Sequence, residues 1–248
     1  YGDHRDLHSI PTRRSSDLLK KKFGSFIAVD GINFGIYQNE IFGLLGPNGA
    51  GKTTTISMIC GLLPPTEGRI TFANHRIKDR KLLIGYCPQD NIIYPKLTCM
   101  EQLLFIGKMY DYPSRYLKIR AAELLNFLGL KDKAGILAGK LSGGMKRRLN
   151  ICLALIHDPE ILILDEPEAG LDPQSRVLVR DFIKDLGKRK TIILTTHNMD
   201  EADRLADRLS IIDHGRLLRL DTPQNLKKMV GEGEDRKSTR LNSSHVSQ

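Results

Sequence analysis

The chain has 248 residues, of which 40% are hydrophobic, and a formal charge of +9 at pH 7. This length and composition suit one large or two small globular domains with a substantial core, and no apolar run approaches the ~18 residues that a membrane-spanning helix needs. The basic residues are scattered and not interleaved with aromatics, so we expect no nucleic-acid partner. The cysteines form no CxxC pair and are typical of reduced, buried thiols in a cytosolic protein: Cys60, Cys87, Cys99 and Cys152.

The two ends of the chain show no hydrophobic period. Residues 1–18 resemble the translation of a short-read sequencing adapter at every position except Ile10, and residues 235–245 resemble the translation of the opposite adapter. We therefore expect 1–18 and 232–248 to be artefactual or disordered flanks around a domain at 19–231. Native disordered tails are the alternative.

The first part of the domain is predicted to form a small antiparallel sheet. Residues 26–29 and 32–36 have strand patterns on either side of Asp30-Gly31, which is a hairpin signal. Phe23 precedes them beside Gly24 and could stack on a purine ring, or be an ordinary half-buried strand aromatic.

A phosphate-binding loop is predicted next. An apolar strand at 41–45 leads into the sequence GPNGAGKT at 46–53, and a helical pattern follows. The glycines let successive N–H groups and the start of the helix point at one anion. Lys52 would reach the β and γ phosphates, and the Thr53 hydroxyl would complete a Mg²⁺ shell.

Strands at 68–72 and 82–86 are predicted after this helix, followed by a block of helices. Gln89 lies just after the second of these strands and could coordinate Mg²⁺ or its water, or simply be solvated. The block covers about 91–157 and contains LSGG at 141–144, where Ser142 is a natural N-cap. Gly143-Gly144 leaves N–H groups free at this helix start, which favours a second anion-binding terminus.

Two buried strands that end in ionisable side chains follow the helical block. The strand at 161–164 ends in Asp165 and Glu166, which fit a Mg²⁺ ligand and a base that polarises the attacking water; an exposed loop start is the alternative. A helix at 174–186 leads to a strand at 191–196 that ends on His197, at the sheet edge where a γ-phosphate would lie. Strands at 208–212 and 216–220 and a helix opening at 222–223 complete the predicted elements.

Taken in order, these motifs resemble the nucleotide-binding subunit of an ATP-binding cassette (ABC) transporter, and LSGG is the most specific of them. The resemblance spans about residues 19–231. It implies an α/β fold with a P-loop NTPase core of mainly parallel sheet, an N-terminal antiparallel β-subdomain and a helical insertion. It also implies an ATPase that uses ATP and Mg²⁺ as cofactors, works as a homodimer or with a paired nucleotide-binding subunit, and binds transmembrane permease subunits at the cytoplasmic face of the membrane.

The resemblance also implies a role for each motif residue. Glu166, His197 and Gln89 would be catalytic, and Thr53, Gln89 and Asp165 would hold the metal. The expected nucleotide contacts, several of them made across a dimer, are Phe23, Val29, Asn48, Gly49, Gly51, Lys52, Thr53, Thr54, Ser142, Gly143, Gly144 and Asp172. The departures are Phe23 for the common Tyr, Met145 for the common Gln, and Glu168-Ala169 for a small polar pair.

The finer similarity, at residues 85–90, 141–149 and 196–202, is to the subgroup that pairs with multidrug, antibiotic or lipid exporters. The alternative is a soluble ABC-type ATPase acting in translation or DNA repair. A P-loop kinase is disfavoured by LSGG and His197.

Overall fold

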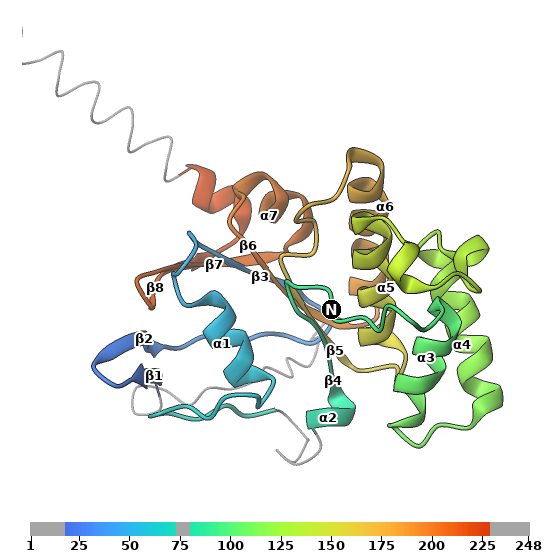
Figure 1. The fold of residues 1–248 in the computed structure, drawn as a ribbon. Coiled ribbons are helices and arrows are strands. Elements are labelled where there is room, and N and C mark those ends of the chain that lie inside the picture. The colour runs from blue at the N-terminus through green and yellow to red at the C-terminus, as the bar shows by residue number, and fades with distance from the viewer. Residues whose placement is uncertain (1–17, 73–79, 229–248) are drawn as a thin grey trace, which may run out of the picture.

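The computed structural model describes residues 18–72 and 80–228 (Figure 1). The predicted flanks, 1–18 and 232–248, lie outside the described residues except for Leu18, so the adapter hypothesis stays a prediction. Among the described helices, none combines the length and apolar character needed to cross a bilayer.

A six-stranded sheet forms the centre of the fold, and five of its strands run parallel. Its strands, in spatial order, are β4 (Ile84–Cys87), β5 (Ile161–Asp165), β6 (Thr191–Thr196), β3 (Ile41–Leu45), β7 (Arg208–Asp213) and β8 (Arg216–Asp221). Only β8 is antiparallel, to β7. Because the parallel strands point the same way, the loops that follow β3, β4, β5 and β6 gather at one edge of the sheet.

Both faces of the sheet are buried, as continuous apolar strands predict. Along β5, Leu162 and Leu164 belong to one core cluster, while Ile161 and Ile163 belong to a second cluster with Phe42 of β3. The helices cover these two faces: α1 (Lys52–Ile59), α2 (Arg80–Leu83), α3 (Cys99–Lys108), α4 (Ser114–Phe127), α5 (Gly143–Leu155), α6 (Pro173–Gly187) and α7 (Met199–Leu205). Figure 1 shows α3, α4 and α5 gathered on the side of the sheet away from α1.

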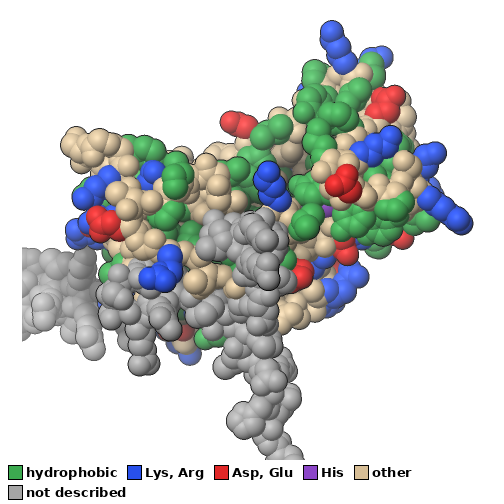
Figure 2. Space-filling view, turned by 90° about the horizontal axis from the view of Figure 1, so that it is seen from below, with side chains coloured by type: hydrophobic (Ala, Val, Ile, Leu, Met, Phe, Trp, Pro, Cys, Tyr) green, Lys and Arg blue, Asp and Glu red, His purple; other side chains and the backbone are tan. Residues whose placement is uncertain are grey.

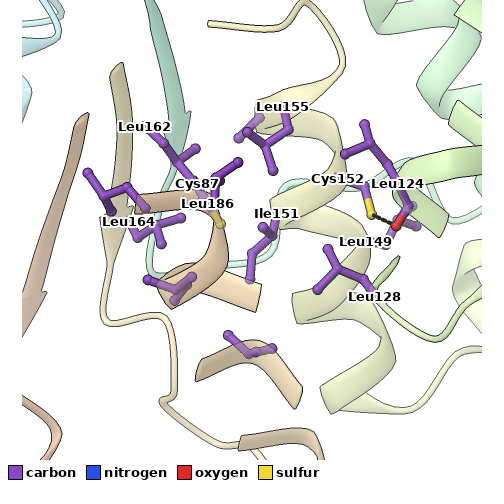
Figure 3. Close-up of a cluster of buried hydrophobic side chains, with 14 of the residues drawn as sticks. Cys87, Leu124, Leu128, Leu149, Ile151, Cys152, Leu155, Leu162, Leu164 and Leu186 are labelled. Atoms are coloured by element: carbon purple, nitrogen blue, oxygen red, sulfur yellow. Dashed lines mark hydrogen bonds between the residues drawn. The ribbon is translucent and has the colours of Figure 1, made fainter. Parts of the chain in front are cut away.

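Helix α5 joins the helical lobe, which consists of α3, α4 and α5, to the sheet. Figure 3 shows Ile151 and Leu155 of α5 beside Leu162 and Leu164 of β5, while Cys152 lies against α4, where its thiol contacts the Leu124 carbonyl at 3.6 Å. This packing fixes α5, and with it the LSGG segment at its start, relative to the strands. Three cysteines are buried free thiols as predicted, whereas Cys60 is only half-buried.

The N-terminal antiparallel pair is present, but its predicted turn is wrong. Strand β1 (Leu19–Phe23) pairs with β2 (Phe26–Ile32) across a turn at Gly24, and β2 continues straight through Asp30-Gly31. The Asp30 N–H donates to the Gly215 carbonyl at 2.7 Å, and the Asp30 carboxylate accepts from Arg216. These distant partners hold the segment extended, which outweighs its local turn preference.

Residues 68–72, predicted as a strand, have no strand assignment among the described residues. Glu67, just before them, pairs with Lys20 in an isolated bridge. Ile70 and Phe72 are nevertheless buried in the core that backs β3, so the apolar pattern correctly indicated burial.

His157 is a buried histidine that follows α5. Its ring stacks on Tyr110 at 4.0 Å between centroids, and its Nε2 lies 3.3 Å from the Ile84 carbonyl oxygen. Nδ1 has no hydrogen-bond partner within the described chain. Burial is the main reason that the pKa of His157 is lowered to about 4.

This burial predicts acid sensitivity. Between the pKa of about 4 in the folded state and the ordinary value of about 6.5, the unfolded chain binds a proton that the folded chain does not. The free energy of unfolding therefore has its full value above this pH range and decreases as the pH is lowered through it. Moving from about pH 7.5 to about pH 5 is expected to reduce the free energy of unfolding by about 2 kcal/mol through His157 alone. Urea unfolding at the two pH values measures this. His157→Phe keeps the stacking and should lose most of the pH dependence, whereas His214→Asn, at an exposed position, should keep it; equal slopes in the two variants would contradict the assignment.

Candidate active site

The glycine-rich loop lies between β3 and α1 with its backbone open to an approaching anion. Gly49 has φ of 80°, and an added Cβ there would find no atom within 4 Å. Gly51, with φ of 100°, caps the N-terminus of α1 and leaves no room for a side chain, because an added Cβ would lie 2.5 Å from the Ala28 carbonyl oxygen. The conformation therefore requires glycine at both positions, and Asn48 and Gly49 are exposed beside the helix start.

Lys52 folds back over this loop. Its Nζ donates to the carbonyl oxygens of Gly46 at 2.7 Å and Pro47 at 2.9 Å, and only 6% of the residue is exposed. Burial lowers the pKa of Lys52, and the negative charges of Glu166 and Asp165 partly offset that effect. The ammonium group thus lies in an acidic neighbourhood at the mouth of the loop.

Asp165 ends β5 as a buried carboxylate with hydroxyl partners on both oxygens. Its Oδ2 accepts from Thr53 Oγ1 at 3.1 Å and its Oδ1 from Thr195 Oγ1 at 2.5 Å. Oxygen donors of this kind suit a hard divalent cation. The described residues contain no cluster of three or more His, Cys, Asp or Glu able to hold a metal ion.

Glu166 brings three loops together. Its backbone has φ of 50°, unusual for a residue with a side chain, and its N–H donates to Thr195 Oγ1 at 2.9 Å. One carboxylate oxygen lies 3.1 Å from His197 Nδ1, and the other accepts from Gln89 Nε2 at 3.5 Å. The His197 side chain is 56% exposed and Gln89 is exposed as well, so both partners of this largely buried carboxylate face solvent.

The LSGG segment forms a second group of predicted residues. Ser142 caps α5 by accepting from the Met145 N–H at 3.3 Å, and Ser142 and Gly143 are exposed. An added Cβ at Gly144 would lie 3.2 Å from Asp172 Oδ2, so the signature glycine and Asp172 are neighbours. Asp172 caps α6, and its hydrogen bonds with Ser175 lower its pKa. Across residues 18–72 and 80–228, no hydrogen bond or ion pair joins Ser142, Gly143, Gly144 or Asp172 to the glycine loop.

The remaining predicted contacts lie around the loop. Phe23, on β1, is 49% exposed, and Lys21 Nζ lies 5.2 Å from the centre of its ring. Val29 is fully buried and would contact a Cβ on Gly51 at 3.5 Å, so its side chain supports the loop from beneath. Thr54 is partly buried in the first turn of α1.

Comparison with known proteins identifies the family. A sequence profile described as "ABC transporter" matches residues 29–169. The linearmycin resistance ATP-binding protein LnrL of Bacillus subtilis is 46% identical over 218 residues, which cover 86% of this chain and 70% of that protein. The chain belongs to the ABC transporter family.

Further relatives and solved ABC structures support membership of the same family. The Nod factor export ATP-binding protein I of Sinorhizobium fredii is 43% identical over 224 residues, which cover 86% of this chain and 65% of that protein. The structure of an ATP-binding subunit of an ABC transporter superposes with a TM-score of 0.78 at 28% identity, over 87% of this chain and 92% of that one. CbiO1 of Clostridium perfringens gives 0.77 at 28% identity, over 91% and 93%.

The predicted family, fold class and ATPase activity are thereby confirmed. This ABC chain is an ATP-binding, ATP-hydrolysing subunit, and the relatives support the transporter prediction rather than an ATPase of translation or DNA repair.

Glu168, one of the departures from the family pattern, has an unexpected partner. Its side chain is completely buried and accepts two hydrogen bonds from the Arg180 guanidinium of α6, at 3.1 and 2.9 Å. This ion pair fastens the segment after Glu166 to α6, and its hydrogen bonds raise the pKa of Arg180.

Two other residues of the site were not foreseen from the sequence. Thr195 contacts both Asp165 and Glu166, and the pairing of Asp165 with Thr195 across β5 and β6 explains why. The available signal was a pair of threonines at the end of a strand whose centre is apolar. Arg147, in the first half of α5, is the second, and it donates to backbone carbonyl oxygens of Gln89 and Glu166.

Proposed function

We propose that this chain is the ATPase subunit of an exporter, with Glu166 as the general base of hydrolysis. The observation that carries this is the meeting of Glu166, Gln89 and His197 at the sheet edge where Lys52 and the Thr53–Asp165 pair also lie. Glu166 would take a proton from the attacking water, and Gln89 and His197 would orient the water and the terminal phosphate.

ATP would be bound by the glycine loop. The N–H groups at Asn48, Gly49 and Gly51 and the start of α1 attract the phosphates, and Lys52 contributes its positive charge. Thr54 would add a hydroxyl in the first turn. The exposed ring of Phe23 suits stacking against the adenine.

The residues fit Mg²⁺ as well. Thr53 and Asp165 offer hydroxyl and carboxylate oxygens from adjacent elements. Gln89, whose amide nitrogen donates to Glu166, carries an amide oxygen that could be a further ligand. When bound, the ion would neutralise charge on the phosphates.

The site would be completed by a second subunit, either a copy of this chain or a paired relative. Ser142 and Gly143 are exposed at the start of α5, and nothing in the described chain bonds them to the glycine loop. In a head-to-tail pair, Ser142, Gly143, Gly144 and Asp172 of each copy would meet the nucleotide of the other. ATP would then favour closure, because its γ-phosphate is fully satisfied only between two subunits.

A hollow beside β4 suits the transmembrane partner. It has a volume of about 720 Å³ and is lined by exposed apolar side chains that include Leu62, Ile92 and Met109, with Pro88 of the Gln89 loop at its wall. Figure 2 shows hydrophobic side chains at several places on the face of the molecule seen from below. We propose that a permease segment at the cytoplasmic membrane face docks here, which would make the chain a peripheral membrane subunit. Export of a lipid-like or antibiotic-like compound is proposed from the names of the relatives, which concern linearmycin resistance and Nod factor export.

The docking proposal predicts that a charge placed in the hollow weakens association with the transmembrane partner. Ile92→Glu or Met109→Glu should place a charge in the apolar hollow and reduce co-purification with a co-expressed transmembrane permease subunit by about tenfold or more, since burying an unpaired carboxylate is costly. ATP-driven transport in vesicles should fall with it, while ATP binding by the purified chain stays unchanged. Phe127→Glu is the matched control, because Phe127 is also an exposed apolar residue, 59% accessible, but lies in a different hollow with Val177 and Phe182. Equal loss in all three variants would contradict docking beside β4.

A further inference from the structure

Arg147 is a buried arginine that spans the two loops of the active site. It lies in the first half of α5 and is 2% exposed. Its Nη1 donates to the carbonyl oxygens of Pro88 and, at 3.1 Å, Gln89; its Nη2 donates to those of Asp165 and, at 3.1 Å, Glu166. Its Nε donates to the Pro167 carbonyl oxygen at 3.5 Å. One side chain therefore holds the loop after β4 and the loop after β5 together.

These contacts use the whole hydrogen-bonding capacity of the guanidinium. Arginine has five N–H donors in a rigid plane, and each of them has a backbone carbonyl here. In the part of the chain that the structure describes, no carboxylate pairs with Arg147 within the ion-pair distance of 4.0 Å, and the hydrogen-bond partners of its guanidinium are backbone carbonyls. A lysine has a single nitrogen and cannot span both loops in this way.

We propose that Arg147 is a positioning residue that sets the spacing between Gln89 and the catalytic Glu166; this rests on the proposed function. The two side chains meet at 3.5 Å only because their backbones are fixed relative to one another, and Arg147 touches both backbones. It acts through Gln89 and Glu166 and does not contact substrate.

The location of Arg147 extends this role. Ser142, at the exposed start of α5, lies little more than one helical turn from Arg147, and Pro88 borders the hollow beside β4. A shift of α5 on subunit closure, or a shift of the Gln89 loop on partner docking, would reach Glu166 through the same guanidinium. The residue thus connects the helical lobe to the base by direct hydrogen bonds.

A purely structural role makes a different prediction. If Arg147 only fastened α5 to the sheet, its loss would lower the melting temperature and reduce nucleotide binding and turnover together, in proportion to the folded fraction. If it positions Glu166, turnover falls while ATP binding by the glycine loop remains. The ratio of these two effects separates the alternatives.

Arg148 provides the matched control. It is the next residue of α5, and its guanidinium donates to the carbonyl oxygens of Leu128 at 2.9 Å and of Gly129 and Gly144 at 3.4 Å, none of them in the loops after β4 or β5. Arg148→Met should lower the melting temperature and leave the ratio of kcat to the folded, ATP-binding fraction within about twofold of the wild type.

The test compares Arg147→Met, Arg147→Lys and Arg148→Met in the full chain. Melting temperature, the Kd for ATP and kcat per ATP-binding site are measured for each. Arg147→Met is expected to lower kcat by about 10- to 100-fold with Kd changed by less than about threefold, and Arg147→Lys to fall between it and the wild type. If Arg147→Met fails to fold, the loss of kcat in Arg147→Lys decides whether Arg147 has the positioning role.

One outcome would contradict the positioning role of Arg147, and a different outcome would contradict the proposed function. Wild-type kcat per site in Arg147→Lys, or a loss in either Arg147 variant no larger than in Arg148→Met, would overturn the positioning role and leave the proposed ATPase untouched. Absence of Mg²⁺-dependent turnover by the wild-type chain assembled with its partner subunits would overturn the proposed function itself.

Discussion

Replacing Glu166 by Gln is expected to slow ATP hydrolysis by about 10²- to 10⁴-fold while ATP still binds. The amide has nearly the shape of the carboxylate, so the contacts with His197 and Gln89 can largely persist. It cannot accept the proton of the attacking water, and this is the whole of the intended change. Because Glu166 does not contact the glycine loop through any hydrogen bond of the described chain, ATP affinity should remain within a few-fold of the wild type.

The measurement is phosphate release with Mg²⁺, with EDTA as a blank that the proposed metal site predicts to be inactive, alongside titration with a fluorescent nucleotide. Glu40→Gln is the matched control. Glu40 is also a buried glutamate, 6% exposed, but it precedes β3 at the opposite edge of the sheet and pairs with Arg208 at 3.1 Å. It should lose stability and keep turnover. Wild-type hydrolysis by Glu166→Gln would show that another group is the base.

The same variant tests the two-subunit site. If hydrolysis opens the closed pair, Glu166→Gln with ATP and Mg²⁺ should accumulate as a dimer on size-exclusion chromatography, and ADP should not produce it. A Gly143→Trp change, which adds bulk where an added Cβ meets no atom within 4 Å, should prevent that dimer without unfolding the chain.

The sheet was largely predictable because its strands are marked by continuous apolar runs. The strands at 161–165 and 191–196 appear almost at their predicted bounds, since a parallel strand buried on both faces needs apolar residues throughout. The hairpin at Asp30-Gly31 failed for the opposite reason. A local turn signal there competes with Gly215 and Arg216, which are nearly 200 residues away in the chain and leave no trace in the local sequence.

The candidate site likewise contains residues that the sequence predicts and residues that it does not. Residues that act through their own loop, such as Lys52 in the glycine loop, follow from a motif and its spacing. Arg147, Thr195 and the Glu168–Arg180 pair do not, because their partners are backbone atoms or side chains brought close by strand register and helix packing. The sequence therefore predicts which groups gather at this edge of the sheet better than it predicts what holds them in place.

Replacing Lys52 by Ala is expected to weaken ATP binding by about 10- to 100-fold, since a hydrogen bond to a charged group is worth about 1.5–3 kcal/mol and every ~1.4 kcal/mol is tenfold. The change removes the positive charge from the mouth of the loop. It also leaves the carbonyl oxygens of Gly46 and Pro47 without the donor that now lies 2.7 and 2.9 Å away, which loosens the loop conformation. Isothermal titration with ATP and with ADP measures the loss.

Lys190→Ala is the control for this variant. Lys190 is another largely buried lysine, its side chain 14% exposed and paired with Asp158 at 2.9 Å, but it precedes β6 at the edge of the sheet away from the loop. Its loss should lower the melting temperature without changing ATP affinity. Unchanged ATP binding in Lys52→Ala would mean that Lys52 does not contact phosphate. Because Lys52→Ala should fail at binding and Glu166→Gln only at turnover, the two together distinguish an ATPase from a chain that merely holds an anion at a helix start.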